Sequence, residues 1–284
     1  MNGVRAARVI HTGQAIVDLV LTVDALPDIG GDVFASSHEL TAGGGFNVMA
    51  AAARDGASVV YAGGRGSGPF AAIVDAALRR EGIAATAVAH PRSDIGFSVA
   101  LVDADAERTF VSTTGAEADI APDHFDSVKL RAGDVVYVSG YSLYHRTVGP
   151  TVLAWLSRVR PSTVVVDASP MIDAVPHDLL AAARSVATLW TLNQREAQLL
   201  LAKIAPDTRA GSIDQVAGVL ADTLRRDVIV RVGADGCVLA SPGGAPELIA
   251  GFPTAAIDTN GAGDAHTGVL CAGLAAGHPL AECA

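Results

Sequence analysis

The stretch Val186-Ala187-Thr188-Leu189-Trp190-Thr191-Leu192 is an apolar run of the kind found in buried strands, and the residues after it indicate the fold class. Helical patterns cover residues 193–203 and 213–225, and a second apolar run, Val228–Val232, comes next. A strand followed by helices and then by another strand needs a crossover connection, which is typical of parallel sheets. The same alternation predicts further buried strands at Val59–Tyr61, Asp134–Val138 and Val164–Asp167, and further helices at 46–55, 69–81, 146–159 and 262–276. We therefore expect an α/β fold with a mostly parallel sheet covered by helices on both faces.

Two regions depart from this alternation. Residues 14–38 contain an alternating β pattern from Ile16 to Thr22 that leads into the turn Pro27–Gly31. Residues 95–113 have the pattern of a hairpin around a turn at 103–105. Because these β segments lie outside the strand–helix rhythm, they predict a small second sheet, which we interpret as a lid.

Composition limits the class of protein. The chain has 284 residues, of which 50% are hydrophobic and 18% charged, so it can bury a core and is not disordered. Polar residues or glycines interrupt every apolar stretch before the roughly 18 residues of a membrane span. A formal net charge of −10 disfavours a nucleic-acid partner. Three widely spaced cysteines and an N-terminus without an apolar signal region predict a cytoplasmic protein.

The strongest local motif is Asp258-Thr259-Asn260-Gly261-Ala262-Gly263-Asp264, which runs into the apolar helical stretch Ala265–Ala276. A glycine-rich turn at a helix start exposes unpaired N–H groups at the positive end of the helix dipole, which favours anion binding. A carboxylate beside a bound anion has a chemical purpose if it accepts a proton from a third group, such as a hydroxyl. The alternative is that Asp264 only caps the helix.

Two further motifs precede predicted helices. Gly43-Gly44-Gly45-Phe46-Asn47 would let a ligand press on the backbone while Asn47 binds hydroxyl groups, or it is a capped tight turn. Gly63–Gly68 lacks the spacing of a dinucleotide fingerprint and is better interpreted as a flexible turn.

Asn193 and Glu196 follow the strand pattern Val186–Leu192 and lie one helical turn apart. An amide and a carboxylate at this spacing could hold hydrated Mg²⁺, or they could form a capping box. Asp167 is another carboxylate at the end of a predicted strand. The eight histidines show no zinc-binding spacing, and the sequence contains neither a P-loop nor a serine-hydrolase elbow.

Taken together and in this order, Gly43–Asn47, Asn193/Glu196 and Asp258–Asp264 resemble the PfkB (ribokinase-like) carbohydrate kinase family over essentially the whole chain. The resemblance implies a three-layer α/β/α, mostly parallel ribokinase-like fold. It would form a single domain over residues 1–284, with a discontinuous β lid from about 14–38 and 95–113. The implied reaction is ATP-dependent phosphorylation of a hydroxymethyl group of a small sugar. The family also suggests a homodimer formed through the lid sheets.

The resemblance assigns roles to individual residues. Asp264 matches the catalytic base, and the N–H groups of Gly261, Ala262 and Gly263 match the anion hole for the transferring phosphoryl group. The positions that match substrate contacts are Asp18, Gly44, Gly45, Asn47 and Arg108. Those that match nucleotide contacts are Asn193, Arg231, Gly233, Ala234 and Gly236. Asn193 and Glu196 match the residues that position Mg²⁺ through water, and Asp258 matches a possible site for a monovalent cation, K⁺.

The sequence also departs from the family pattern. Phe46 stands where a small or basic residue is common, so an aromatic ring at the sugar site could alter substrate choice. His266 replaces an aromatic residue and is interpreted mainly as packing, with a second base as the alternative. Asn260 replaces a threonine that supports the monovalent-cation site in some members, which argues against potassium activation. Relatives continue past the position of Ala284 with helices that help close the adenine pocket, so either the chain is truncated or nucleotide binding is weakened.

Three other functions remain as alternatives. A nucleoside kinase shares the Asp258–Asp264 motif, and Phe46 could stack on a base. A sugar- or nucleotide-binding regulator without catalysis would keep the binding residues alone. A dehydrogenase is the most distant alternative.

Overall fold

The computed structural model describes residues 6–105, 107–256 and 259–284. Its main sheet has nine strands in the order β13-β12-β11-β10-β9-β8-β1-β4-β5. Seven of these strands pair in parallel, and β12 and β13 add an antiparallel edge. The strands are β1 (Arg8–His11), β4 (Ser58–Tyr61), β5 (Ala84–Ala85), β8 (Val135–Ser139), β9 (Thr163–Asp167), β10 (Leu189–Asn193), β11 (Asp227–Arg231), β12 (Gly236–Ala240) and β13 (Glu247–Ala250). The predicted mostly parallel sheet is confirmed.

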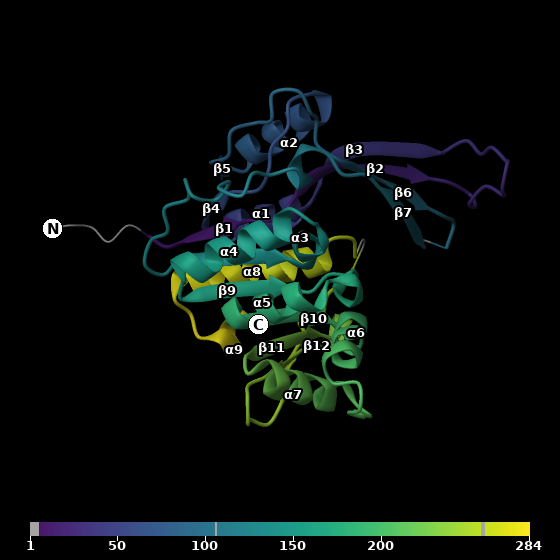
Figure 1. The fold of residues 1–284 in the computed structure, drawn as a ribbon. Helices are drawn as coiled ribbons and strands as arrows, with labels where there is room; N and C mark the ends of the chain where they lie inside the picture. The colour runs from purple at the N-terminus through teal and green to yellow at the C-terminus, as the bar shows by residue number, and fades with distance from the viewer. Residues whose placement is uncertain (1–5, 106, 257–258) are drawn as a thin grey trace.

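Helices cover both faces of this sheet (Figure 1). The helices are α1 (Gly45–Arg54), α2 (Pro69–Arg80), α3 (Gly140–Tyr144), α4 (Val148–Val159), α5 (His177–Val186), α6 (Gln194–Ile204), α7 (Ile213–Leu224), α8 (Ala262–Ala276) and α9 (Leu280–Cys283). Alternate residues of a strand point to opposite faces, and β8 shows the consequence. Val136 and Val138 pack in one hydrophobic core with α3 to α7, whereas Val135 and Tyr137 pack in a second core with α1, α2 and α8. Two cores on the two faces of one sheet make the expected three layers.

The second sheet contains four strands in the order β3-β2-β6-β7. They are β2 (Ala15–Thr22), β3 (Ser37–Gly44), β6 (Phe97–Val102) and β7 (Arg108–Ser112), so both predicted β regions contribute to it. In Figure 1 these strands extend away from the main body as an arm.

The two faces of this smaller sheet differ in polarity. Cross-strand pairing aligns one row of polar residues, which are Thr41, Asp18, Ser98 and Ser112. The adjacent row on the opposite face is apolar and contains Leu40, Leu19, Val99 and Val111. Leu40 and Val111 keep 45% and 65% of their surface exposed. We call these the polar row and the apolar row of the small sheet.

Some boundaries differ from the sequence-based prediction. Val186 ends helix α5, and β10 begins only at Leu189. The short strand β1, the helix α5 and the edge strands β12 and β13 were not predicted. No helix in the described part of the chain combines the length and the apolar character that crossing a membrane requires.

Candidate active site

Two helix N-termini meet beyond the carboxyl ends of the parallel strands. Helix α8 packs tightly against α1. The two helices are so close at Gly268 that a Cβ atom there would lie only 2.4 Å from the carbonyl oxygen of Val48. At the start of α8, a Cβ atom on Gly261 would lie 3.6 Å from the side-chain nitrogen of Asn47 in α1. The glycine motif near the N-terminus and the one near the C-terminus therefore form one site, in the position where open α/β sheets bind ligands.

Asp264 lies in the first turn of α8 and accepts a hydrogen bond from Asn47 Nδ2 on its Oδ2 atom (3.3 Å). The pKa of Asp264 is raised from 3.8 to about 6, mainly by burial and also by the nearby Asp167 and Asp18 carboxylates. The Asn47 hydrogen bond and the Arg231 charge lower this pKa and offset part of the rise. A carboxylate with a pKa near neutrality is a stronger proton acceptor than a solvated aspartate. The N-cap residue of α8 is Gly261, and no side chain forms a capping hydrogen bond there. Asp264 therefore does not cap the helix.

The backbone at the start of α8 determines which N–H groups face the site. Gly261 is the N-cap residue and has φ +72°, a conformation that favours glycine. The N–H group of Ala262 donates to the Thr259 carbonyl (3.2 Å), and the first helical bond runs from Ala265 to Gly261 (2.8 Å). The N–H groups of Gly263 and Asp264 precede that helical bond, so they point out of the helix end.

Arg231, at the end of β11, connects several elements below the α8 N-terminus. Its Nη1 atom donates to Thr191 Oγ1 (2.6 Å) and to Thr267 Oγ1 (3.1 Å). Both terminal nitrogens lie 3.4 Å from the oxygens of Asp167, and Nη2 lies 3.5 Å from Glu196 Oε2. Thr267 Oγ1 also donates to Asp167 Oδ2 (2.9 Å), which connects α8 to the sheet. One cation, whose side chain is 13% exposed, is thus shared by Asp167 at the end of β9 and Glu196 in the first turn of α6.

Asn193 and Glu196 form a capping box. Asn193 Oδ1 accepts from the N–H of Glu196, and Glu196 Oε2 accepts from the N–H of Asn193, each at 2.8 Å. Burial and the nearby Asp167 raise the pKa of Glu196, although the Asn193 N–H and Arg231 lower it. The capping box that the sequence offered as an alternative is therefore present, and it fixes both side chains at the end of β10, beside Arg231.

Asp18 reaches the site from the small sheet. A Cβ atom on Gly43 would lie 1.9 Å from Asp18 Oδ2, so only glycine leaves room for this carboxylate. Burial raises the pKa of Asp18, and a hydrogen bond from the Gly44 backbone lowers it. Gly45 begins α1, and its N–H donates to the Gln14 carbonyl (2.9 Å). The polar row that contains Asp18 therefore lies on the face of the small sheet that adjoins the α1 and α8 N-termini.

The other residues implied by the family resemblance lie in the small sheet and in the turn after β11. Arg108 pairs with Val102 near the tip of the small sheet, four residues along β6 from Ser98, and is not brought beside Asp18. Gly233 and Ala234 form a 3-10 turn after β11, and Gly236 begins β12, where a Cβ atom would lie 2.1 Å from the Ile249 carbonyl. Asp258 lies outside the described residues.

Two departures from the family pattern have structural explanations. Phe46, in the first turn of α1, is 6% exposed and packs in the hydrophobic core, so little of its ring is accessible to an acceptor. His266 is half-buried, and neither ring nitrogen has a hydrogen-bond partner among the described residues. Burial and the nearby Arg231 lower its pKa to about 4, which supports packing over a role as second base.

Sequence reasoning missed Thr191 and Thr267 and gave Asp167 no role. Thr191 and Thr267 lie in a strand and in a helix without any local motif, and only their shared contact with Arg231 connects them. The position of Asp167 at a strand end was the one signal available.

Sequence comparison relates the whole chain to kinases. The model of the pfkB family of carbohydrate kinases matches residues 6–284. An uncharacterized sugar kinase of Escherichia coli is 30% identical over 275 residues, which cover 96% of this chain and 84% of that protein. A ribokinase of Haemophilus influenzae is 26% identical over 262 residues, which cover 90% of this chain and 81% of that protein.

Solved structures show the same fold. Ribokinase from Thermotoga maritima aligns with a TM-score of 0.80 at 18% identity and covers 98% of this chain and 89% of its own. Adenosine kinase from Anopheles gambiae aligns with a TM-score of 0.80 at 20% identity and covers 98% of this chain and 92% of its own. These similarities confirm the ribokinase-like fold, and the family model confirms the assignment from the motifs. The protein belongs to the pfkB family of carbohydrate kinases and is an ATP-dependent kinase.

Proposed function

We propose that the protein transfers the γ-phosphoryl group of ATP to a hydroxymethyl oxygen of a small sugar. The observation that supports this most directly is the position of Asp264, which is half-buried at the start of α8 beside Asn47 and close enough to Asp18 for that carboxylate to raise its pKa. A proton acceptor and outward-facing N–H groups occupy one helix end there. The small sheet would act as the lid of a single domain over residues 1–284.

In the proposed reaction, Asn47 and Asp18 orient the acceptor, and Asp264 takes the proton of its hydroxyl group. The hydroxyl oxygen forms a bond to the γ-phosphorus, and the bond to the β,γ-bridging oxygen breaks. The leaving ADP keeps the electron pair of that bond. The N–H groups of Gly263 and Asp264 stabilise the negative charge on the transferring group, where one donor is typically worth about 3–4 kcal/mol. The loop that carries Gly233, Ala234 and Gly236 would contact the nucleotide.

The residues present are suited to Mg²⁺. No group of three or more His, Cys, Asp or Glu side chains within residues 6–105, 107–256 and 259–284 could hold a metal directly. Mg²⁺ does not need such a group, because it keeps several waters and binds proteins through one or two carboxylates plus substrate phosphates. The Glu196 carboxylate, whose raised pKa reflects burial near Asp167, is in position to bind those waters together with Asn193. The ion would neutralise charge on the phosphates, and no role for K⁺ is proposed.

The polar row favours a sugar over a nucleoside. It presents hydroxyl and carboxylate groups to the site, and Ser98 and Ser112 are joined by a hydrogen bond of 2.9 Å. Such groups match the hydroxyls of a sugar, whereas a base would need an apolar or aromatic surface. Phe46 offers little such surface because it is buried in the core, and the exposed Phe110 on this face lies two residues along β7 from Ser112. A nucleoside kinase remains the second candidate, since an adenosine kinase shares the fold.

A substrate panel tests this proposal. We expect ADP formation with Mg-ATP and ribose or fructose, and a kcat/KM for adenosine at least about tenfold lower, since adenosine would leave polar groups of the site unpaired. Turnover of adenosine above both sugars would replace the sugar assignment with the nucleoside one. Binding of sugar or Mg-ATP without any ADP formation above background would instead support the regulatory alternative.

We also propose that the apolar row forms a homodimer interface with a second copy of the chain. Val111 and Leu40 are exposed on the face of the small sheet opposite Asp18, and dimerisation through lid sheets is what the family suggests. Val111→Asp should convert a dimer into a monomer, because it places a charge in an apolar interface. Sedimentation velocity measures this change. Phe110→Asp is the matched control, since Phe110 is similarly exposed but points to the opposite face. A monomeric wild-type protein would contradict the proposal.

A further inference from the structure

A buried glutamate closes the base of the β6–β7 hairpin. Glu117 is 2% exposed, and its two oxygens accept hydrogen bonds from two separate backbone positions. Oε2 accepts from the N–H of Gly96 (2.8 Å), just before β6, and Oε1 accepts from the N–H of Gly115 (2.9 Å), just after β7. The carbonyl of Gly96 in turn accepts from the N–H of Val17 in β2 (3.4 Å). One carboxylate therefore connects both ends of the hairpin at the point where the hairpin joins β2.

A second carboxylate fixes the same region to α2. Asp94 Oδ2 accepts from the N–H of Phe70 (3.0 Å), and Asp94 Oδ1 accepts from Ala71 (2.8 Å). The Asp94 carbonyl accepts from the N–H of Ala116 (2.9 Å), one residue before Glu117. Asp94 thus caps the N-terminus of α2 and is joined to the hairpin base.

The glycine-rich loop 63–68 supports this base. A Cβ atom on Gly64 would lie 2.8 Å from the Cα atom of Glu117, and one on Gly66 would lie 2.8 Å from the backbone of Asp94 and Ile95. A Cβ atom on Gly68 would lie 2.5 Å from the Asp94 carboxylate. The sequence motif was interpreted as a flexible turn, but close packing against the hairpin base explains its glycines.

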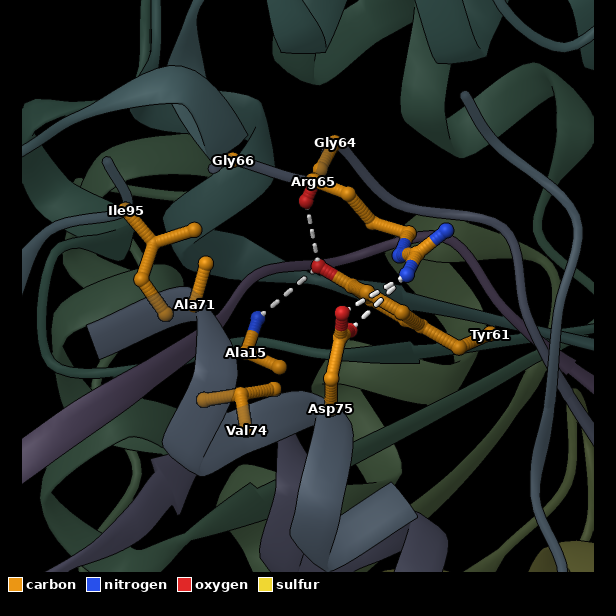
Figure 2. A pocket seen from close by; sticks show the side chains of 9 residues that line it. All are labelled: Ala15, Tyr61, Gly64, Arg65, Gly66, Ala71, Val74, Asp75 and Ile95. Atoms are coloured by element: carbon orange, nitrogen blue, oxygen red, sulfur yellow. Dashed lines mark hydrogen bonds and ion pairs between the residues drawn. The ribbon is translucent and has the colours of Figure 1, made fainter. Parts of the chain in front are cut away.

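The start of β2 is fixed to the same loop. Figure 2 shows Tyr61, whose hydroxyl donates to the Gly64 carbonyl (2.7 Å) and accepts from the N–H of Ala15 (3.2 Å). The Arg65–Asp75 ion pair (2.9 Å) closes the loop beside it. The cavity lined by these residues has a volume of only about 10 Å³, so the loop packs closely against the start of β2.

We infer that Glu117 is a positioning residue for the phosphate acceptor. By fixing Gly96, it determines where Ser98 lies, two residues along β6, and with it the polar row that faces the acceptor. Glu117 acts through the hairpin and need not touch the substrate. This inference rests on the proposed function, because it assumes that the polar row binds the acceptor.

Glu117→Gln tests the inference. A glutamine offers one acceptor oxygen and an NH₂ group, which would face one of the two N–H donors without bonding to it. With the better sugar of ribose and fructose, we expect the KM for sugar to rise about tenfold while the KM for ATP changes less than about twofold, because a displaced contact weakens acceptor binding alone. Hydrogen exchange of peptides within 96–115 should also become faster.

Asp134→Asn is the matched control. Asp134 is 1% exposed and, like Glu117, accepts from two backbone N–H groups, those of Arg8 and Arg131, each at 2.8 Å. It directly precedes β8, at the amino ends of the parallel strands, whereas the site lies beyond their carboxyl ends. This variant should lower the Tm without changing the KM for sugar or the exchange of 96–115. Glu117→Asp, which is too short to reach both donors, serves as a second variant if Glu117→Gln does not fold.

The outcomes separate the two proposals. A wild-type enzyme that phosphorylates neither sugar contradicts the proposed function. In that case, hydrogen exchange of peptides within 96–115 in the Glu117 variants still tests whether Glu117 holds the two ends of the hairpin together. An active wild-type enzyme whose KM for sugar is unchanged in the folded Glu117 variants contradicts the inference. An equal rise in the Asp134→Asn control would also contradict it, because the effect would then follow from general destabilisation.

Discussion

Replacing Asp264 with asparagine should abolish most of the activity and, at the same time, stabilise the ligand-free protein. A positioned general base typically contributes a factor of about 10²–10⁴ to the rate, and asparagine cannot accept the hydroxyl proton. Asparagine can still accept the hydrogen bond that Asn47 donates to this position, so the local structure should persist. We expect kcat to fall by about 10²–10⁴, with the KM for sugar and ATP nearly unchanged.

The expected stabilisation follows from the pKa of Asp264. The pKa rises from 3.8 to about 6 in the folded protein, mainly by burial, so ionisation of this carboxylate opposes folding. This cost is absent below pH 4, grows between pH 4 and 6, and is complete above pH 6. Asparagine does not ionise, so the variant should gain roughly 1–3 kcal/mol at pH 8 and nothing at pH 4. Denaturant unfolding at the two pH values measures this difference.

The wild-type pH profile provides the complementary result. If ionised Asp264 is the base, kcat/KM should fall as the pH decreases through about 6, because the protonated form cannot accept a proton. Asp126→Asn, at an exposed carboxylate distant from the site, is the control and should change neither activity nor its pH dependence. Full activity of Asp264→Asn would rule out Asp264 as the base. A variant that is no more stable than wild type at pH 8 would contradict the raised pKa of Asp264.

The sequence alone predicted most of the fold because the buried strands are uniformly apolar and the helices between them are rich in alanine and leucine. Its errors fall where these signals are weak. The apolar run that starts at Val186 does not separate the end of α5 from the start of β10, since a buried helix end and a buried strand have the same composition. Strand β1 has only four residues, too few for a pattern.

The candidate site was predictable only where a motif is local. Asn47, Asp264 and Glu196 each lie at a helix start with a recognisable sequence, and the structure brings the first two together. The surroundings of Arg231 were not predictable, because Thr191, Asp167 and Thr267 come from separate elements that meet only in the folded chain. Glu117 was missed for the same reason: its role depends on two backbone positions, not on a side-chain pattern.

Arg231→Met should lower stability and shift the pH dependence of the reaction. The guanidinium is the positive charge shared by Asp167 and Glu196, and its side chain is only 13% exposed. Removing one partner of a buried ion pair typically costs about 3–5 kcal/mol, because the other charge is left unpaired. The loss should be greatest at pH 8, where the carboxylates are ionised, and smaller at pH 5, where those with raised pKa values begin to take up protons.

The same variant should make Asp264 harder to ionise. Arg231 lowers the pKa of Asp264, so its removal should move the acidic limb of kcat/KM to higher pH, by about one unit for each 1.4 kcal/mol of lost interaction. Arg231→Lys keeps the charge but cannot bond Thr191, Thr267 and Asp167 at once, so it should lose stability while the limb stays in place. A merely structural arginine would make both variants less stable and leave both profiles at the wild-type pH. A limb that moves in Arg231→Met alone would show that this charge, which lies beneath the α8 N-terminus, keeps the base ionised at neutral pH.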